Sequence, residues 1–286
     1  MKPDLKQWAV PGQWLAPGAL LAAAMCAVVF LWSTPFLWML IASFRPDPGG
    51  GLGMASLFPD FVPTLQSYRY AIEDGYWPLW FLNSTILVIG TLVVQLVTIS
   101  LAGYAFARIN FPGKEAIFYI FLLQLMLAPP VLIVPNLTTL VHLGLYDSLI
   151  GVMAPYWGSA FGTFLMRQTF RTIPKDFEEA AIIDGASWWQ VLRYVLIPLS
   201  LPGLTAFSIV SVVYHWNEFL WPLMVINDPD KMVLTVGLVS FAQGAEGASD
   251  WGLIAAGTLF IMAPLFIAFT AFQRQFVNSF MSSGVK

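Results

Sequence analysis

A stripe of polar side chains runs through an otherwise apolar stretch in the last third of the chain. Its members recur at steps of three, three, four and three residues: Thr205, Ser208, Ser211, His215 and Glu218. This spacing places them on one face of a helix, and Tyr214 and Asn217 widen that face. A carboxylate at membrane depth costs at least a few kcal/mol on insertion scales, so Glu218 is a candidate functional residue.

Two roles are open for this stripe. It can line a water-filled cavity that handles a polar solute, or its hydroxyls can join neighbouring helices while His215 satisfies Glu218. We favour the cavity, with Ser208, Ser211, Tyr214, His215, Asn217 and Glu218 as its residues. A weaker stripe in the second apolar run favours helix packing: Ser84, Thr91, Gln95 and Thr98.

The commoner catalytic motifs are missing from the sequence. It has no G-x-x-x-x-G-K-[ST] phosphate loop, no H-E-x-x-H zinc site and no G-x-S-x-G nucleophile motif. The one cysteine, Cys26, can build neither a disulfide framework nor a Cys-ligated metal site within the chain. The net charge is −3 without a basic patch, which argues against nucleic acid as a partner. We expect a protein that is not an enzyme and binds no metal or cofactor.

The elements that must position the stripe are membrane-spanning helices. Hydrophobic residues make up 58% of the 286 residues and charged residues only 10%, where a soluble protein has about 25% charged. Six uncharged runs are each long enough, or nearly so, to cross a bilayer as a helix. The predicted spans are roughly 15–42, 79–105, 117–139, 148–164, 199–225 and 252–272. Pro129, Pro130 and Pro135 must break or kink the third.

The basic residues predict the orientation of these spans, because cytoplasmic loops carry the excess of Lys and Arg. The side that holds both termini has ten: Lys2, Lys6, Arg108, Lys114, Arg167, Arg171, Lys175, Arg193, Arg274 and Lys286. The other side has three: Arg45, Arg69 and Lys231. Both termini are therefore expected in the cytoplasm. The first apolar run is too long for a cleaved signal peptide and is expected to be the first helix.

The longest predicted cytoplasmic stretch, residues 167–193, contains residues typical of the ends of two short helices. Pro174 suits a first helical position, and Gly185 suits a left-handed cap that ends the helix. Ser187 and Gln190 form a capping box that begins a second helix. This hairpin could lie flat on the inner leaflet of the membrane. Alternatively, it could be a docking surface for a cytoplasmic protein, in which Glu179 pairs with a basic groove of that protein.

The exact residues of the hairpin decide between these readings. The hairpin has Glu179-Ala180-Ala181, then Gly185 after three residues, then Val195-Leu196-Ile197-Pro198 after nine. This pattern resembles the EAA motif of binding-protein-dependent ABC importer permeases. Further segments resemble the carbohydrate-importer branch of that family, which includes the six-span permeases of maltose-type and glycerol-phosphate-type systems: Ala102–Arg108, Leu143–Ser148, Phe164–Gln168, Trp216–Pro222 and Phe272–Arg274.

The resemblance implies an all-α type I importer permease fold, with the whole chain, 1–286, as a single transmembrane domain. It implies a second permease as a heterodimeric partner in the lipid bilayer, two ATPase subunits that hold ATP and Mg, and an extracytoplasmic solute-binding protein. The expected location is a bacterial-type cytoplasmic (inner) membrane. By residue match, the hairpin 174–198 couples to the ATPase through Glu179, Ala180, Ala181, Asp184, Gly185 and Pro198.

The kind of cargo is predicted from the absence of Lys and Arg in all six spans. An anion at mid-membrane needs a cationic or strongly dipolar partner, so we expect a neutral carbohydrate rather than glycerol 3-phosphate or another small anion. A membrane scaffold or receptor without a transport path is the alternative of another class. The outer loop 227–251, rich in glycine, is expected to be flexible and to contact the solute-binding protein.

Overall fold

The computed structural model describes residues 15–45, 62–73, 76–244 and 251–282, and every regular element among them is a helix. This confirms the all-α class. The chain forms two compact units. One comprises residues 1–71 and 245–259, and the other comprises residues 72–244 and 260–286. The prediction of one domain stays a prediction.

The first unit is built on helix α1 (Leu15–Ala42), whose side chains are largely exposed, as Leu20 (74%) and Trp32 (74%) illustrate. An apolar helix with this much exposed surface is suited to lipid. The chain after α1 contacts α2 (Gln66–Glu73): Tyr68 of α2 donates a hydrogen bond to Ser43 Oγ at 2.8 Å, and its ring lies 5.5 Å from that of Phe44. Helix α14 (Trp251–Ser282) begins in this unit, where Trp251 meets Trp38 edge to face.

The second unit is organised around α3 (Trp77–Arg108), a single unbroken helix of 32 residues. It packs closely on α7 (Ala160–Thr172), because a Cβ on Gly103 would lie 2.6 Å from Cβ of Met166. Helix α11 (Leu201–Asn217) completes this packing. The buried core includes Ile99, Met166, Phe170, Leu196 and Phe207.

Breaks in the apolar helices shape the rest of this unit. Helix α4 (Lys114–Leu123) continues into η3 (Gln124–Met126), and the chain then turns by 104° into η4 (Pro129–Leu132) and α5 (Ile133–His142). The break falls at Leu127 and Ala128, directly before Pro129 and Pro130, whose missing backbone donors predicted a break here. A gentler bend of 44° separates α6 (Leu149–Met153) and η5 (Ala154–Tyr156) from α7.

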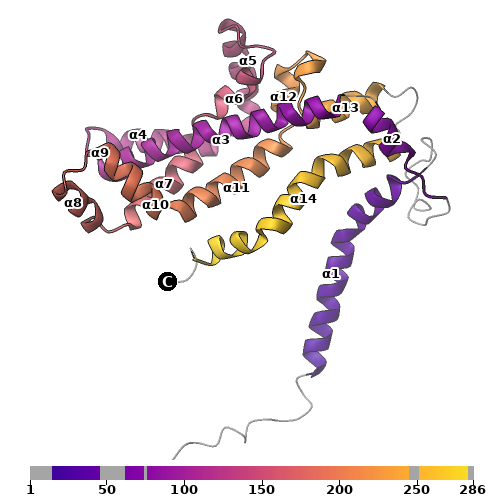
Figure 1. Cartoon of the computed structure of the whole chain (residues 1–286), viewed down its shortest axis with the longest axis horizontal. Coiled ribbons are helices and arrows are strands. Elements are labelled where there is room, and N and C mark those ends of the chain that lie inside the picture. The colour runs from indigo at the N-terminus through magenta and orange to yellow at the C-terminus, as the bar shows by residue number, and fades with distance from the viewer. Residues whose placement is uncertain (1–14, 46–61, 74–75, 245–250, 283–286) are drawn as a thin grey trace, which may run out of the picture. The chain divides into compact units, whose positions relative to one another are not determined.

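The predicted hairpin is present. Helix α8 (Asp176–Ile183) is followed by Gly185, whose φ of +84° confirms the left-handed cap. Ser187 and Gln190 form the capping box that begins α9 (Trp188–Gln190). The helix continues through the π-helical η6 (Val191–Leu196) and α10 (Ile197–Leu199), then bends by 75° into α11. Helices α8 to α10 lie at one end of α3, and α13 lies at its other end (Figure 1).

Two helices have bounds other than those of the predicted spans, whose limits in the membrane stay predictions. The fifth, predicted as continuous over 199–225, is interrupted at Glu218 and Phe219, between α11 and α12 (Leu220–Val225). The fourth does not end near Phe164, because α7 runs to Thr172 and buries Arg167. That charge is tolerated because Arg167 pairs with Glu115 at 2.9 Å and lies over the Phe118 ring.

The segment after α12 is more ordered than its glycines suggested. It contains η7 (Pro229–Lys231) and α13 (Leu234–Gly244). The expectation of a flexible loop is wrong at Gly237, where a Cβ would lie 2.3 Å from the Trp80 ring, so this glycine serves close packing. Residues 245–250 lie outside the described residues.

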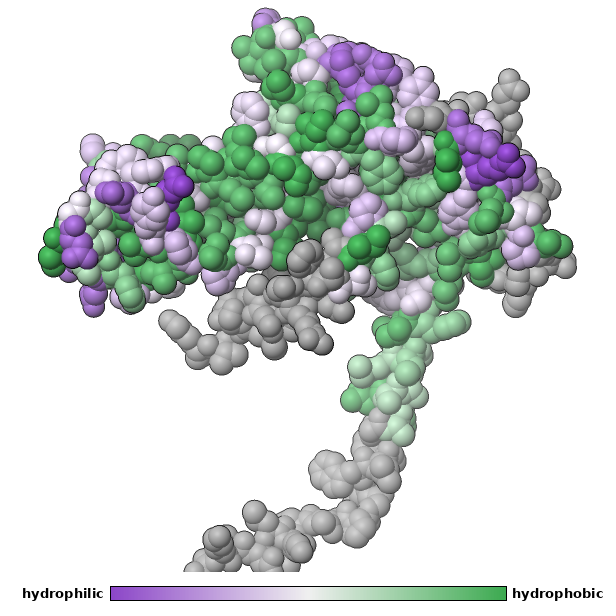
Figure 2. Space-filling view, in the orientation of Figure 1, coloured by the Kyte–Doolittle hydropathy of each residue, from purple (hydrophilic) through white to green (hydrophobic). Residues whose placement is uncertain are grey.

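Length and composition are consistent with a membrane protein. Two described helices, Ala19–Ala42 and Trp77–Arg108, are long and apolar enough to cross a bilayer alone, and five segments qualify if each bent pair is one span. The described apolar part of the last helix is Trp251–Ile267, so the count of six spans stays a prediction. Hydrophobic residues cover the middle of the second unit, and hydrophilic residues gather near α8 and near the loop between α12 and α13 (Figure 2).

Candidate functional site

A cavity of about 500 Å³ lies where the broken helices of the second unit meet. Its walls are the α4–α5 break, the bend before α7, and the junction of α11 with α12. The apolar part of the lining includes Leu127, Pro129, Pro130, Ile133, Phe161 and Phe207. The polar part includes Gln95, Gln124, Asn136, Tyr156, Ser159, Ser211, Tyr214, His215 and Glu218. Broken helices therefore supply a pocket that continuous helices would fill.

Gln95 of α3 is the centre of the polar contacts in this cavity. Its Oε1 accepts a hydrogen bond from the Ser211 hydroxyl at 2.6 Å. Its Nε2 donates to the backbone oxygen of Tyr156 at 2.7 Å and lies 3.4 Å from Nε2 of His215. Because Ser211 and His215 sit on α11, Gln95 joins the two long helices at the cavity wall.

His215 is only 5% exposed, yet its ring nitrogen Nδ1 has no hydrogen-bond partner among the described residues. The Tyr156 ring lies 4.6 Å away and the Tyr214 ring 5.1 Å away, both edge to face. A buried ring nitrogen without a partner is costly unless something outside the chain, such as water or a solute, supplies a hydrogen bond.

Glu218 occupies the break between α11 and α12. Its carboxylate accepts a hydrogen bond from the Trp221 backbone at 3.4 Å, and its own carbonyl oxygen accepts one from Thr235 Oγ1 at 2.7 Å. The acid therefore sits at the start of α12, where free amides favour negative charge. Neither histidine contacts its carboxylate in the described structure, so the pairing of His215 with Glu218 considered above is replaced by the contact of His215 with Gln95.

The predicted stripe divides into two groups. Ser211, Tyr214, His215 and Glu218 line the cavity. Ser208 and Asn217 do not, since Ser208 donates to the Leu204 carbonyl at 2.8 Å and Asn217 to the Val213 carbonyl at 2.7 Å, both within α11. Gln95 was assigned to packing, yet it also lines the cavity. Its signal was a side-chain amide in the middle of the long apolar run 79–105, whose other amide, Asn83, lies near the start.

The predicted coupling residues form an exposed surface on the hairpin. Glu179, Ala180, Asp184, Gly185 and Pro198 are exposed, whereas Ala181 is half-buried against the core of the second unit. Large hydrophobic side chains are exposed around them: Phe177 (51%), Ile182 (60%), Ile183 (85%) and Trp188 (61%). Apolar side chains with an acid among them are typical of a surface that a partner covers.

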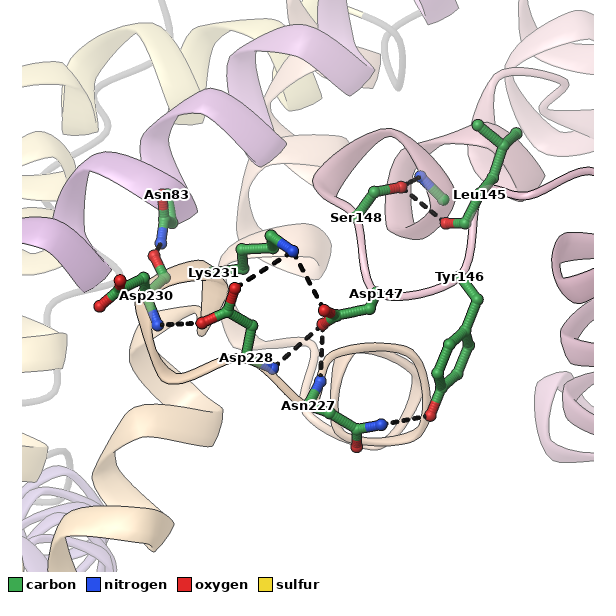
Figure 3. Close-up of polar contacts among 10 residues, drawn as sticks. Asn83, Leu145, Tyr146, Asp147, Ser148, Asn227, Asp228, Asp230 and Lys231 are labelled. Atoms are coloured by element: carbon green, nitrogen blue, oxygen red, sulfur yellow. Dashed lines mark hydrogen bonds and ion pairs between the residues drawn. The ribbon is translucent and has the colours of Figure 1, made fainter.

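A polar network joins the chain before α6 to the chain after α12 (Figure 3). Asp147 has a left-handed backbone, with φ of +55°, and its Oδ1 accepts hydrogen bonds from the amides of Asn227 at 2.9 Å and Asp228 at 3.1 Å. Lys231 pairs with Asp147 at 3.0 Å and Asp228 at 3.2 Å. Because Asp147 precedes α6 and Asn227 follows α12, the network ties these two helices together.

Hydrogen bonding sets the charge state of this network. The amide donors of Asn227 and Asp228, and then Lys231, hold the pKa of Asp147 below its usual value of 3.8, although partial burial opposes them. Asp147 and Asp228 raise the pKa of Lys231. A carboxylate with a lowered pKa stabilises the fold above its unfolded pKa, and this stabilisation is lost as the pH falls through the folded pKa. The network is therefore intact at neutral pH.

We expect Asp147→Ala to increase hydrogen exchange of the Asn227 and Asp228 amides about fivefold at neutral pH, because both lose their acceptor. Asp147→Asn is the matched control, since it keeps an acceptor and tolerates the left-handed backbone. In the parent, the protection should fall at acid pH, below the usual range of carboxyl groups. Equal exchange in the alanine variant and the parent would contradict this role for Asp147.

Comparison with known proteins identifies the family. Residues 99–281 match the model of the binding-protein-dependent transport system inner membrane component. This chain belongs to that family. It is therefore a membrane permease of a binding-protein-dependent transport system and not an enzyme.

Curated relatives and a solved structure agree with this assignment. The permease is similar to the diacetylchitobiose uptake permease NgcG of Streptomyces coelicolor, with 33% identity over 84% of this chain and 80% of the relative. It is also similar to the sn-glycerol-3-phosphate permease UgpE of Salmonella typhimurium, with 33% identity over 78% and 79%. Its fold matches a chain of a bacterial ABC transporter for alginate, with a TM-score of 0.81 and 21% identity over 92% of this chain and 99% of that one.

Proposed function

We propose that this permease forms, with a second permease, the path of an ATP-driven importer for a neutral carbohydrate. The cavity at Gln95, Ser211 and His215 is its part of that path. The observation that carries the cargo class is the lining: the described residues around the cavity include amides, hydroxyls, aromatic rings and one acid, but no Lys or Arg. Such a set can hydrogen-bond and stack on a sugar, whereas an anion would lack a cationic partner.

The hairpin surface around Glu179 is the proposed dock for one of the two ATPase subunits, which hold the ATP and Mg that this chain is not expected to bind. The exposed acid and the apolar residues around it support this assignment. The solute-binding protein is proposed to deliver cargo at the opposite end, near the Asp147 network. With both termini in the cytoplasm and six spans in the inner membrane, the hairpin faces the cytoplasm and the network faces outward.

Glycerol 3-phosphate is the second candidate cargo, because the Salmonella relative carries that name at 33% identity. Uptake into liposomes that contain the whole complex separates the candidates. Labelled mono-, di- and oligosaccharides are compared with glycerol 3-phosphate, each with ATP, with a non-hydrolysable analogue, and without the binding protein. Saturable, ATP-dependent uptake of a neutral sugar is expected. Uptake of the phosphate ester alone would contradict the neutral cargo, and no uptake of any solute would favour a scaffold.

A further inference from the structure

Arg108 and Glu178 form a buried ion pair between the end of α3 and the first turn of α8. The two side chains are only 9% and 12% exposed. Arg108 Nη2 also donates to the backbone oxygen of Ile173 at 2.7 Å, just after α7. Arg108, at the end of α3, thus contacts both the residue that leads into the hairpin and the first helix of the hairpin.

Such a pair resists separation, because removal of one partner leaves an uncompensated buried charge. A second arginine supports it. Arg167 of α7 donates from Nε to the Phe106 carbonyl at 3.2 Å and from Nη2 to the Glu115 carboxylate at 2.9 Å and 3.1 Å. Contacts of charged side chains therefore hold the end of α3 to α7, to the start of α4 and to the hairpin.

The same helix reaches the cavity. Gln95 lies 13 residues before Arg108 on α3, a rise of about 20 Å, and α3 is helical throughout this stretch. At that depth Gln95 contacts Ser211, His215 and the backbone of Tyr156. Gly103 lets α3 pack on α7 without a gap, so the two helices resist sliding past each other.

We propose that Arg108 and Glu178 are positioning residues that make the coupling hairpin and α3 move as one body, so that a displacement of the hairpin reaches Gln95 in the cavity. This inference rests on the proposed docking of the ATPase at the hairpin. It assigns to Glu178 a role different from that of the neighbouring Glu179: Glu178 faces inward and transmits movement, whereas Glu179 faces outward and contacts the partner.

Charge reversal and exchange test the pair in the reconstituted complex. Arg108→Glu and Glu178→Arg should each lower the amount of solute transported per ATP hydrolysed about tenfold. The double variant, which restores opposite charges, should restore the parental ratio. Arg171→Glu is the matched control, since Arg171 is an exposed arginine in the last turn of α7 and should leave the ratio unchanged. Parental ratios in both single variants, or a double variant as poor as either, would overturn the proposal.

A distance measurement tests the pair without transport, and so remains decisive if the proposed cargo or partners are wrong. Spin labels are attached to cysteines at exposed Lys175, beside α8, and at exposed Val93 of α3, in the full chain in lipid nanodiscs. The native Cys26, which is exposed, is first replaced by serine. The parent should give one narrow distance distribution and Arg108→Gln a broad one, with narrowness restored by the exchanged pair. An equally narrow distribution in Arg108→Gln would overturn the proposal.

Discussion

Replacing Gly185 with valine is expected to lower transport and the ATP hydrolysis stimulated by loaded binding protein about tenfold. The physical reason is the backbone: φ of +84° at the end of α8 is unfavourable for a β-branched residue. A Cβ at this position meets nothing within 4 Å, so the effect comes from backbone strain and not from a clash. The strain would move the hairpin surface that carries Glu179. ATP hydrolysis and solute uptake in the reconstituted complex are the measurements.

Gly144 offers a matched control for this prediction. It also has positive φ, +68°, and nothing within 4 Å of an added Cβ, but it lies before the Asp147 network. Gly144→Val should therefore carry a similar strain and leave the association of the ATPase subunits with the permease unchanged, whereas Gly185→Val should weaken it. Glu179→Lys, which reverses an exposed charge, should lower stimulation as Gly185→Val does. Parental stimulation in both hairpin variants would refute the docking surface.

Replacing Glu218 with glutamine is expected to weaken the apparent affinity for cargo about tenfold, because hydrogen bonds to a charged group are stronger than those to a neutral one. Basal ATP hydrolysis should change less. Asn217→Ala is the matched control: it is the preceding residue, yet its side chain bonds within α11 and does not line the cavity. Concentration dependence of uptake is the measurement. Equal affinity in Glu218→Gln and the parent would return Glu218 to a structural role as the acceptor of the Trp221 amide at the start of α12.

A second comparison along α11 separates cavity residues from packing residues. Ser211→Ala removes the donor to Gln95 Oε1 and should weaken uptake, whereas Ser208→Ala removes only a bond to the helix's own backbone. The two substitutions are chemically identical and lie three residues apart. If both variants have the same apparent affinity, the Gln95 contact has no role in cargo binding.

The sequence predicted local features well because their causes are local. The positive φ of Gly185, the capping box of Ser187 and the break before Pro129 all follow from neighbouring residues. Their rules need only the preferences of glycine, serine and proline for particular backbone positions. The apolar runs and the all-α class could also be predicted, because the length of the runs alone distinguishes membrane-spanning helices from the helices of soluble proteins.

Features that depend on distant partners could not be predicted in the same way. The Glu218 carbonyl, which Pro222 leaves without its helical donor, is satisfied by Thr235, 17 residues later, and the contact of Gln95 with Ser211 joins residues 116 apart. Helical spacing placed Ser208 and Ser211 on one face, but it could not tell which hydroxyl would meet Gln95. Gly237 had a turn-like composition, and only the position of Trp80 shows that it serves packing.

The sharp turn between α4 and α5 has a consequence for synthesis of the protein. Helix α5 ends at His142 and packs on α12, which begins at Leu220. At roughly 5–20 residues per second, the ribosome needs about 4–16 s to make the intervening chain. During that interval helix α5, which follows the turn at Pro129 and Pro130, lacks a partner on which it packs in the finished fold. Until the fifth apolar segment has been made, the third therefore exists either as a straight insertion intermediate or in contact with the insertion machinery.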